Sequence, residues 1–282
     1  MQLPSKQIRL SIALVTRNRP ESLDRCLKSL RSQSVQPYEV VISDDSDPDF
    51  TKEIEAIASR WDCRYIIGPH RGLYANRNHV ALACEGTHIR TMDDDHVLPD
   101  DHIQQCMEAV LSDPTSIWTT GEIGFINGEY CATAETAAQL YPSGVGGLVT
   151  DINNNWAIAD GSTIYPREVF DRGHKMVECF PFGSSYLEFG AYLYHHGFRS
   201  RCIPGVLIEH YAEPITVTRK NNIKVIKSQL YASICYNFYF KRNSLLGLRY
   251  SLSFIRRANF DRSLILSLNK LINMVKERWD RN

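Results

Sequence analysis

Short apolar runs alternate with amphipathic segments through the first hundred residues. Strands are predicted at Ile8–Thr16, Tyr38–Ser43, Arg64–Ile67 and His88–Met92. A helix is expected from Pro20, because apolar residues then recur on one helical face at Leu23, Cys26, Leu27 and Leu30. A second helix is predicted over about Tyr74–Cys84. Strands and helices in alternation indicate βαβ units around a largely parallel sheet.

The pattern of the second half is less regular. Residues 127–160 are rich in Gly, Asn, Ala and Ser, and we expect a long loop there, of a length that is usually functional or disordered. A helix is predicted over Ser184–His196, followed by strands over Phe198–Ile203 and Val206–His210. Beyond Pro214 the pattern is helical. The expected organisation is an α/β domain over residues 1–214 and a helical C-terminal extension over residues 215–282.

Composition supports one substantial core, since 43% of the 282 residues are hydrophobic. The formal net charge is zero, yet from Arg219 onward fourteen Lys and Arg stand against three acids. The sequence therefore has an acidic body and a basic tail. Neutral overall charge and the lack of a recognition motif argue against nucleic acid as a partner.

Eight cysteines without a CxxC pair, and an N-terminus without a signal sequence, predict reduced thiols and a cytoplasmic location. No uncharged apolar stretch approaches the roughly 20 residues that span a bilayer. Any membrane contact would then be peripheral, on the inner face of the membrane.

Three consecutive acids, Asp93, Asp94 and Asp95, follow the fourth predicted strand. Ligands of open α/β sheets bind beyond the carboxyl ends of strands. In an extended segment Asp93 and Asp95 point to one side and Asp94 to the other. Carboxylates suit Mg²⁺ or Mn²⁺, so Asp93 and Asp95 are candidate ligands. A solvated acidic turn is the alternative.

Five motifs occur together in an order and spacing that resemble family 2 glycosyltransferases. They are Ser11–Thr16 with Arg17-Asn18-Arg19, Leu27–Gln33, Tyr38–Ser46, Gly72 through Arg77-Asn78, and Met92-Asp93-Asp94-Asp95. The likeness covers the first hundred residues strongly and continues weakly to Gly197-Phe198-Arg199. It implies a GT-A fold, Rossmann-like, with a nucleotide-binding half over 1–100 and an acceptor half over 101–214.

The resemblance also implies a donor site. It assigns nucleobase recognition to Asp44 or Asp45, and places Thr16 and Arg17 in the same nucleoside pocket, although Asp-Asp-Ser-Asp-Pro is also good turn chemistry. Arg77 would steady the donor diphosphate, with Arg71 as a rival. Asp93 and Asp94 would lie against the donor. His210, at the end of the last predicted strand, would be a further metal ligand.

One family feature is missing. Inverting members place a Glu and then an Asp, the catalytic base, at the start of a late helix. Here those positions hold Ser185 and Tyr186. Glu188, on the same helical turn, is the predicted substitute base, and Asp160 and Glu178 are less favoured. Alternatively, Glu188 has only a structural role, as a negative charge at the N-terminus of the helix that interacts favourably with the helix dipole.

The expected reaction is a direct displacement with inversion, from a nucleoside-diphosphate sugar, UDP most of all, to an acceptor hydroxyl. The expected acceptor is a glycan, a lipid-linked molecule or a small molecule. The basic, aromatic tail either lies in an anionic membrane interface or packs on the body or on a second subunit of a homodimer.

The sequence argues against two rival functions and leaves a third open. A sugar-phosphate nucleotidyltransferase usually has a Gly-rich loop after the first strand, and Thr16–Pro20 contains no glycine. An NAD-dependent oxidoreductase would need a GxGxxG turn. A sugar-nucleotide-binding partner of another transferase, impaired in catalysis, stays open because the expected base is missing.

Overall fold

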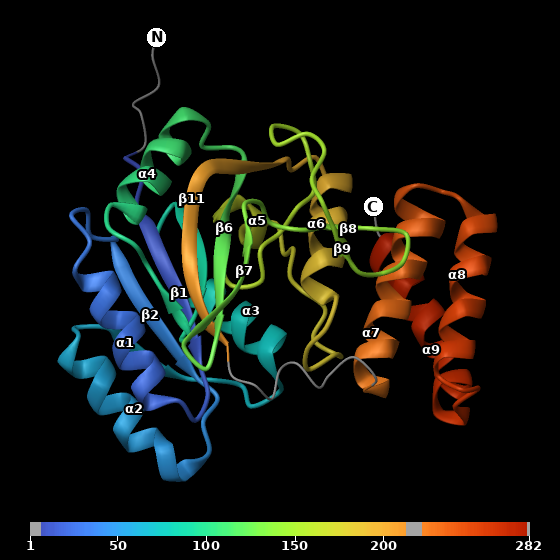
Figure 1. The fold of residues 1–282 in the computed structure, drawn as a ribbon, viewed down its shortest axis with the longest axis horizontal. Coiled ribbons are helices and arrows are strands. Elements are labelled where there is room, and N and C mark those ends of the chain that lie inside the picture. The colour runs from blue at the N-terminus through green and yellow to red at the C-terminus, as the bar shows by residue number, and fades with distance from the viewer. Residues whose placement is uncertain (1–6, 213–221, 281–282) are drawn as a thin grey trace.

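The computed structural model describes residues 7–212 and 222–280. A nine-stranded, mostly parallel sheet lies between two layers of helices (Figure 1). Its strands are β1 (Leu10–Thr16), β2 (Glu39–Asp44), β3 (Arg64–Ile67), β4 (His88–Asp93), β5 (His96–Val97), β6 (Ile117–Ile126), β7 (Glu129–Ala134), β10 (Thr163–Pro166) and β11 (Ser200–Ala212). The strand order is β3-β2-β1-β4-β10-β6-β11-β5, and β7 pairs with β6.

Parallel pairing joins β3, β2, β1 and β4, so their carboxyl ends meet at one edge of the sheet. β10 is antiparallel to β4 and β6, while β6 and β11 are parallel to each other. A separate two-stranded sheet consists of β8 (Gln139–Leu140) and β9 (Gly146–Gly147). The predicted α/β architecture is confirmed.

Helices cover both faces of the sheet. They are α1 (Pro20–Arg31), α2 (Pro48–Arg60), α3 (Leu73–Ala83), α4 (His102–Ser112), α5 (Glu168–Asp171) and α6 (Ser185–His195). Leu10, Ile12 and Leu14 of β1 pack in the core layer of α1, α2 and α4. Ala13 and Val15 belong to the opposite layer, with α3, α5 and α6. Burial on both faces explains why β1 is almost uniformly apolar.

Two segments differ from the sequence-based prediction. The loop expected at 127–160 contains β7, β8 and β9, and the preceding β6 was not predicted. The two strands expected over 198–210 are one strand, β11, whose pairing with β6 shifts between Cys202 and Leu207. Pro204 and Gly205 lie inside this irregularity; proline lacks a backbone donor, and Gly205 has a φ of 74°. Turn residues here mark a bulge rather than a strand end.

Beyond the sheet, the C-terminal helices form a lobe beside α6 (Figure 1). They are α7 (Ile223–Ile234), a π-helical segment η2 (Cys235–Phe240), α8 (Ser244–Arg257) and α9 (Arg262–Trp279). The proposed boundary at 214/215 lies outside the described residues. No helix in the described ranges has the length and apolar character needed to span a bilayer.

One face of α9 is apolar and packs inward. Leu264, Leu271 and Val275 are buried in a cluster that includes Leu187 and Ala191 of α6. A buried ion pair fixes the same contact, since Glu188 Oε1 accepts hydrogen bonds from Arg278 Nε at 2.7 Å and Trp279 Nε1 at 2.9 Å. This contact favours the packing alternative for α9.

We expect Glu188→Gln to lower the free energy of unfolding by about 3 kcal/mol, because it leaves Arg278 buried without a countercharge. Arg278→Met should cost a similar amount, and the double variant less than the sum of the two. Chemical denaturation of the four proteins measures the coupling. Glu277→Gln, an exposed change on the same helix, is the control and should stay within about 0.5 kcal/mol. Additive effects would contradict a coupled pair.

Candidate functional site

Polar side chains gather where the carboxyl ends of β1, β2 and β4 meet. Parallel registration places Thr16 beside Asp44, and Val15 beside Asp93. The chain beyond β4 then turns through Asp94 and Asp95 into β5, which pairs His96 with His210 of β11. The fold therefore brings residues from five strands to one edge, as the strand-end rule leads us to expect.

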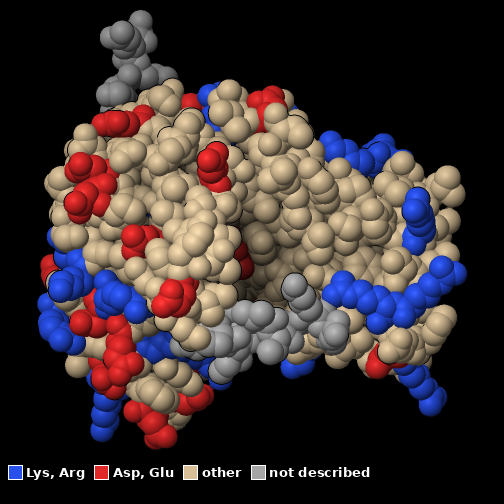
Figure 2. Space-filling model, in the orientation of Figure 1, with Lys and Arg blue, Asp and Glu red and all other residues tan. Residues whose placement is uncertain are grey.

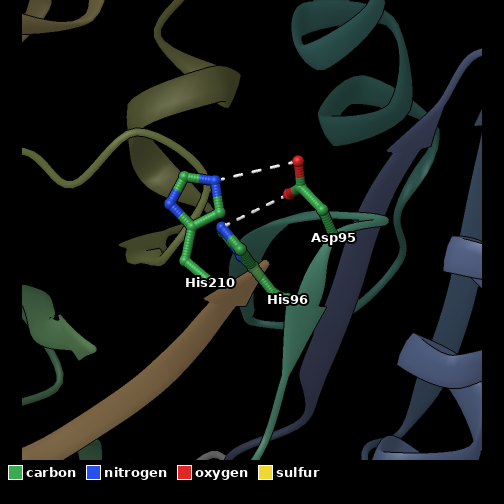
Figure 3. A group of neighbouring side chains, drawn as sticks. All are labelled: Asp95, His96 and His210. Atoms are coloured by element: carbon green, nitrogen blue, oxygen red, sulfur yellow. Dashed lines mark ion pairs between the residues drawn. The ribbon is translucent and has the colours of Figure 1, made fainter. Parts of the chain in front are cut away.

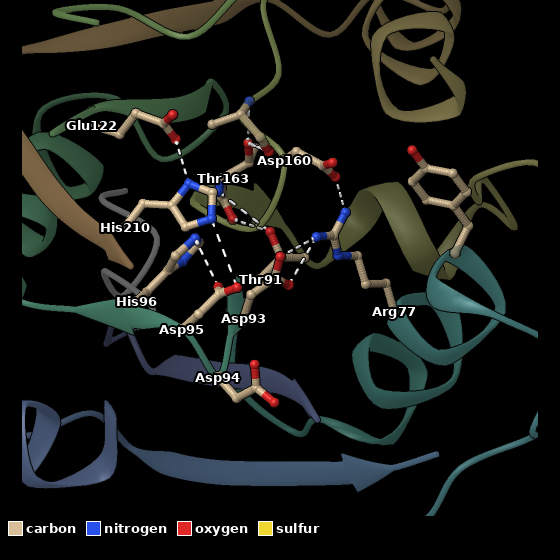
Figure 4. A network of polar contacts seen from close by, with 12 residues as sticks. Arg77, Thr91, Asp93, Asp94, Asp95, His96, Glu122, Asp160, Thr163 and His210 are labelled. Carbon is tan, nitrogen blue, oxygen red and sulfur yellow. Dashed lines mark hydrogen bonds and ion pairs between the residues drawn. The ribbon is translucent and has the colours of Figure 1, made fainter. Parts of the chain in front are cut away.

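Asp94 points away from its two neighbours (Figure 4). Its carboxylate is fully buried, accepts a 2.7 Å hydrogen bond from Thr16 Oγ1 and pairs with Arg19 Nη2 at 2.5 Å. Burial raises the pKa of Asp94, against the opposing charge of Arg19. The prediction that the side chains of Asp94 and Thr16 contact the donor is corrected: they bond to each other inside the protein and hold the tip of the strand.

Asp95 and two histidines form a compact group on the other side (Figure 3). Asp95 Oδ2 lies 3.7 Å from His210 Nε2, and Asp95 Oδ1 lies 3.8 Å from His96 Nε2. His210 Nδ1 lies 3.7 Å from Glu122 Oε2 of β6. Burial disfavours the charged imidazole, but Asp95 and Glu122 outweigh it and raise the pKa of His210 to about 10. His210 thus carries positive charge at this end of the cluster, and it must lose a ring proton before it can bind a metal ion.

The same group fits a divalent ion. One ligand atom from each of Asp95, His96 and His210 lies within 4.8 Å of the others. Two ligands of one ion at about 2.1 Å stand at most about 4.2 Å apart, so a small contraction would close the set. His96 is 1% exposed, and its two ring nitrogens make no hydrogen bond to any residue that the structure describes. Burial lowers the pKa of His96, which favours the neutral form that binds metals.

Arg77 links Asp93 of the acidic run to Asp160. This residue of α3 is 1% exposed. Its Nη2 donates to both carboxylate oxygens of Asp93, at 2.8 and 2.5 Å, and its Nη1 donates to Asp160 (Figure 4). Asp93 is therefore bound by a guanidinium, and its assignment as a metal ligand stays a prediction. Gly161 packs against both Asp93 and His96, where a Cβ would approach within 2.8 and 2.9 Å.

The two acids expected to recognise the nucleobase make hydrogen bonds within the protein. Asp44 and Asp45 are buried at the end of β2. Asp44 accepts hydrogen bonds from Ser46 N and Tyr65 Oη, and Asp45 accepts one from His70 N. The turn interpretation of this segment is therefore correct, and nucleobase recognition by either acid stays a prediction.

Two predicted donor residues lie at the periphery. The Arg17 side chain is 65% exposed and pairs with Asp47 at 3.6 Å. The Arg71 side chain is 64% exposed and pairs with Glu178 at 3.0 Å. Arg77, in contrast, is inside the site. Contact of Arg71 or Arg77 with the donor stays a prediction.

Glu188 does not face the site, and its assignment as the base is corrected. Its side chain is fully buried and bonded to Arg278 and Trp279 of α9. The helical turn that carries Glu188 directs it toward the C-terminal lobe rather than toward Asp93. Asp160, whose side chain is 37% exposed, is the predicted substitute that lies at the cluster. Burial raises the pKa of Asp160 more than Arg77 lowers it.

Sequence reasoning missed three members of the site: Arg19, His96 and Glu122. Arg19 bonds to Asp95 Oδ2 at 2.7 Å and to Asp94, so it neutralises two acids at once. His96 adjoins the acidic run and could have been found from that position. Glu122 sits in β6, a strand that was not predicted, and carries no local signal.

Comparison with known proteins bears on the family and the fold of this chain. Residues 11–174 match the model for glycosyl transferase family 2. A chondroitin synthase of Escherichia coli is 28% identical over 106 residues, which cover 37% of this chain and 16% of that protein. The chain therefore spans only a small part of that relative.

Two solved structures have a similar fold. GalNAc-T7 with UDP, GalNAc and Mn²⁺ gives a TM-score of 0.67 at 14% identity, over 91% of this chain and 57% of that one. S. aureus TarS 1-349 with UDP-GlcNAc gives 0.61 at 16% identity, over 97% and 83% of the two chains. At such identities the likeness shows the fold alone. Since the family model covers more than half of the sequence, the chain belongs to glycosyl transferase family 2 and has the GT-A fold.

Proposed function

We propose that this chain transfers a sugar from a UDP-sugar to an acceptor hydroxyl, with inversion and with the help of Mn²⁺ or Mg²⁺. The observation that carries the proposal is the group of Asp95, His96 and His210 at the tip of β4. UDP and Mn²⁺ in the GalNAc-T7 structure, and UDP-GlcNAc in the TarS structure, support the choice of donor and ion. Family membership argues against a nucleotidyltransferase.

Each residue has a distinct part in the proposed reaction. A divalent ion held by Asp95, His96 and His210 would neutralise the charge that develops on the departing diphosphate. Arg77 orients Asp93 and Asp160, and its guanidinium is suited to phosphate oxygens. Asp160 takes the proton of the acceptor hydroxyl as its oxygen bonds to the anomeric carbon, while the bond from that carbon to the diphosphate oxygen breaks.

A sugar-nucleotide-binding partner without activity is the second candidate. It is favoured by Tyr186 at the family's base position and by the burial of Glu188. Turnover by the purified chain separates the two functions. Cytoplasmic location and a homodimer stay predictions.

Removing the Asp95 carboxylate should abolish metal-dependent donor binding. With UDP and Mn²⁺ at about 100 times the dissociation constant, binding stabilises the native protein by about 2.7 kcal/mol. We expect a thermal-shift assay to show this gain for the unmodified chain, its loss in EDTA, and no EDTA-sensitive gain for Asp95→Asn. Asp171→Asn, a change at a side chain 62% exposed on α5, is the matched control. An undiminished gain in Asp95→Asn would refute the metal site.

Replacing the proposed base should slow catalysis without weakening donor binding. We expect Asp160→Asn to lower kcat by about 10²- to 10⁴-fold, the usual contribution of general base catalysis. A base must be deprotonated to act, and the pKa of Asp160 is raised. The rate of the unmodified enzyme should therefore fall as pH drops through that raised pKa, and Asp160→Asn should lack this limb.

Glu188→Gln is the comparison for this experiment. Under conditions where it remains folded, it should keep kcat near that of the unmodified enzyme, because Glu188 is buried against α9. Full turnover by Asp160→Asn, or a specific loss in folded Glu188→Gln, would overturn the choice of base.

Direct displacement fixes the stereochemistry of the product. The acceptor oxygen attacks from the side opposite the departing UDP, so the anomeric configuration should be inverted. Proton NMR of the first-formed product reads this configuration from the anomeric coupling. A retained configuration would rule out the mechanism while leaving the family and the fold unaffected.

A further inference from the structure

Exposed apolar side chains are concentrated on the C-terminal lobe. Among the described residues, half of the large apolar side chains that are exposed lie between Leu245 and Ile272. They are Leu245, Leu248, Leu252, Phe260, Ile265, Leu266 and Ile272. The remainder are dispersed along the other two hundred residues. Single exposed leucines are ordinary, but such a concentration indicates a contact surface.

The outward face of α8 is the most regular part of this concentration. Leu245, Leu248 and Leu252 follow the i, i+3, i+7 spacing of one helical face and are 81%, 58% and 56% exposed. The opposite face carries Gly247 and Phe254, both buried. α8 thus has an apolar side packed on α7 and η2 and a second apolar side that faces solvent.

The packing of α8 against η2 and the core of the lobe fixes the orientation of the helix, so its leucine face stays directed outward. A Cβ at Gly247 would come within 2.5 Å of the ring of Phe238 in η2, so the two segments are in close contact. Phe254 is 5% exposed and belongs to the core of the lobe. The exposed leucines are therefore held outward by packing on the other side.

Basic residues are interleaved with these leucines. Arg249 and Arg256 lie on the same outward face, both exposed, and α8 contains no acid. Residues 222–280 carry eleven Lys and Arg and three acids, whereas residues 7–212 carry seventeen and twenty-eight. Figure 2 shows Lys and Arg spread over the C-terminal lobe, while acids gather mainly on the body.

We propose that the outward face of α8, formed by Leu245, Leu248, Arg249, Leu252 and Arg256, docks on an anionic lipid surface. Leucines suit insertion at the boundary between headgroups and acyl chains, and arginines suit acidic headgroups. A symmetric pair of two copies through this face would place Arg249 and Arg256 against their own counterparts, which like-charge repulsion disfavours. Vesicle binding requires no turnover, so it can fail while the proposed reaction stands.

Co-sedimentation of the full chain with vesicles tests the proposal. We expect binding to vesicles that contain phosphatidylglycerol, weaker binding as salt is raised, and little binding to pure phosphatidylcholine. Each basic residue near an anionic membrane contributes about fivefold in affinity, so Arg249→Gln with Arg256→Gln should weaken binding by about 25-fold. Leu248→Glu with Leu252→Glu should weaken it at least as much, since it removes apolar contact and adds negative charge.

A matched control uses the same residue types elsewhere on the surface. Leu111 on α4 is 63% exposed, and the Arg60 side chain on α2 is 60% exposed. Leu111→Glu with Arg60→Gln should bind vesicles as the unmodified chain does. Equal binding to neutral and anionic vesicles, or no loss in either α8 variant, would overturn the proposal. So would a dimer in sedimentation velocity without lipid that Leu248→Glu with Leu252→Glu dissociates.

Discussion

The site is governed by the need to balance negative charge at the tip of β4. Asp93 ends this strand, Asp94 and Asp95 follow it in a turn, and Asp160 and Glu122 approach from other segments. Buried carboxylates are stable only with partners. Arg19 binds Asp94 and Asp95, Arg77 binds Asp93 and Asp160, and His210 lies between Asp95 and Glu122. A divalent ion would take the place of the extra proton of His210 in this balance, and a bound diphosphate would offset part of the added positive charge.

The acidic run at the end of β4 is divided between two tasks, because the side chain of Asp94 points away from those of Asp93 and Asp95. Asp94 points inward and secures the strand tip through Thr16 and Arg19, while Asp95 is left for the histidines. In α6, Glu188 likewise has a structural role. Glu188 fastens α6 to α9, so the catalytic body and the C-terminal lobe share a buried ion pair. Asp160, linked to Asp93 through Arg77, is the acid that we propose for proton transfer.

The sequence predicted the elements with strong periodicity and well-placed motifs. β3 was predicted with the bounds that it has, and α3 and α6 were predicted within one residue at each end. The separate direction of Asp94 was also predicted, although Asp94 and Asp95 lie in a turn and not in an extended strand. The orientation of Glu188 could not be predicted, because it depends on the packing of α9, ninety residues away. Glu122 and His96 were missed since tertiary pairing of β6, β11 and β5 creates their proximity. Pro204 and Gly205 suggested a break between strands, although the pairing continues past them.

The central claim is that a cation binds among Asp95, His96 and His210 at the tip of β4. A crystal structure of the chain with UDP and Mn²⁺, measured with anomalous scattering at the manganese edge, tests it most directly. The account predicts one anomalous peak within bonding distance of Asp95 and His210, with the UDP diphosphate as a further ligand. UDP bound with no peak there, or manganese bound elsewhere in the fold, would contradict it.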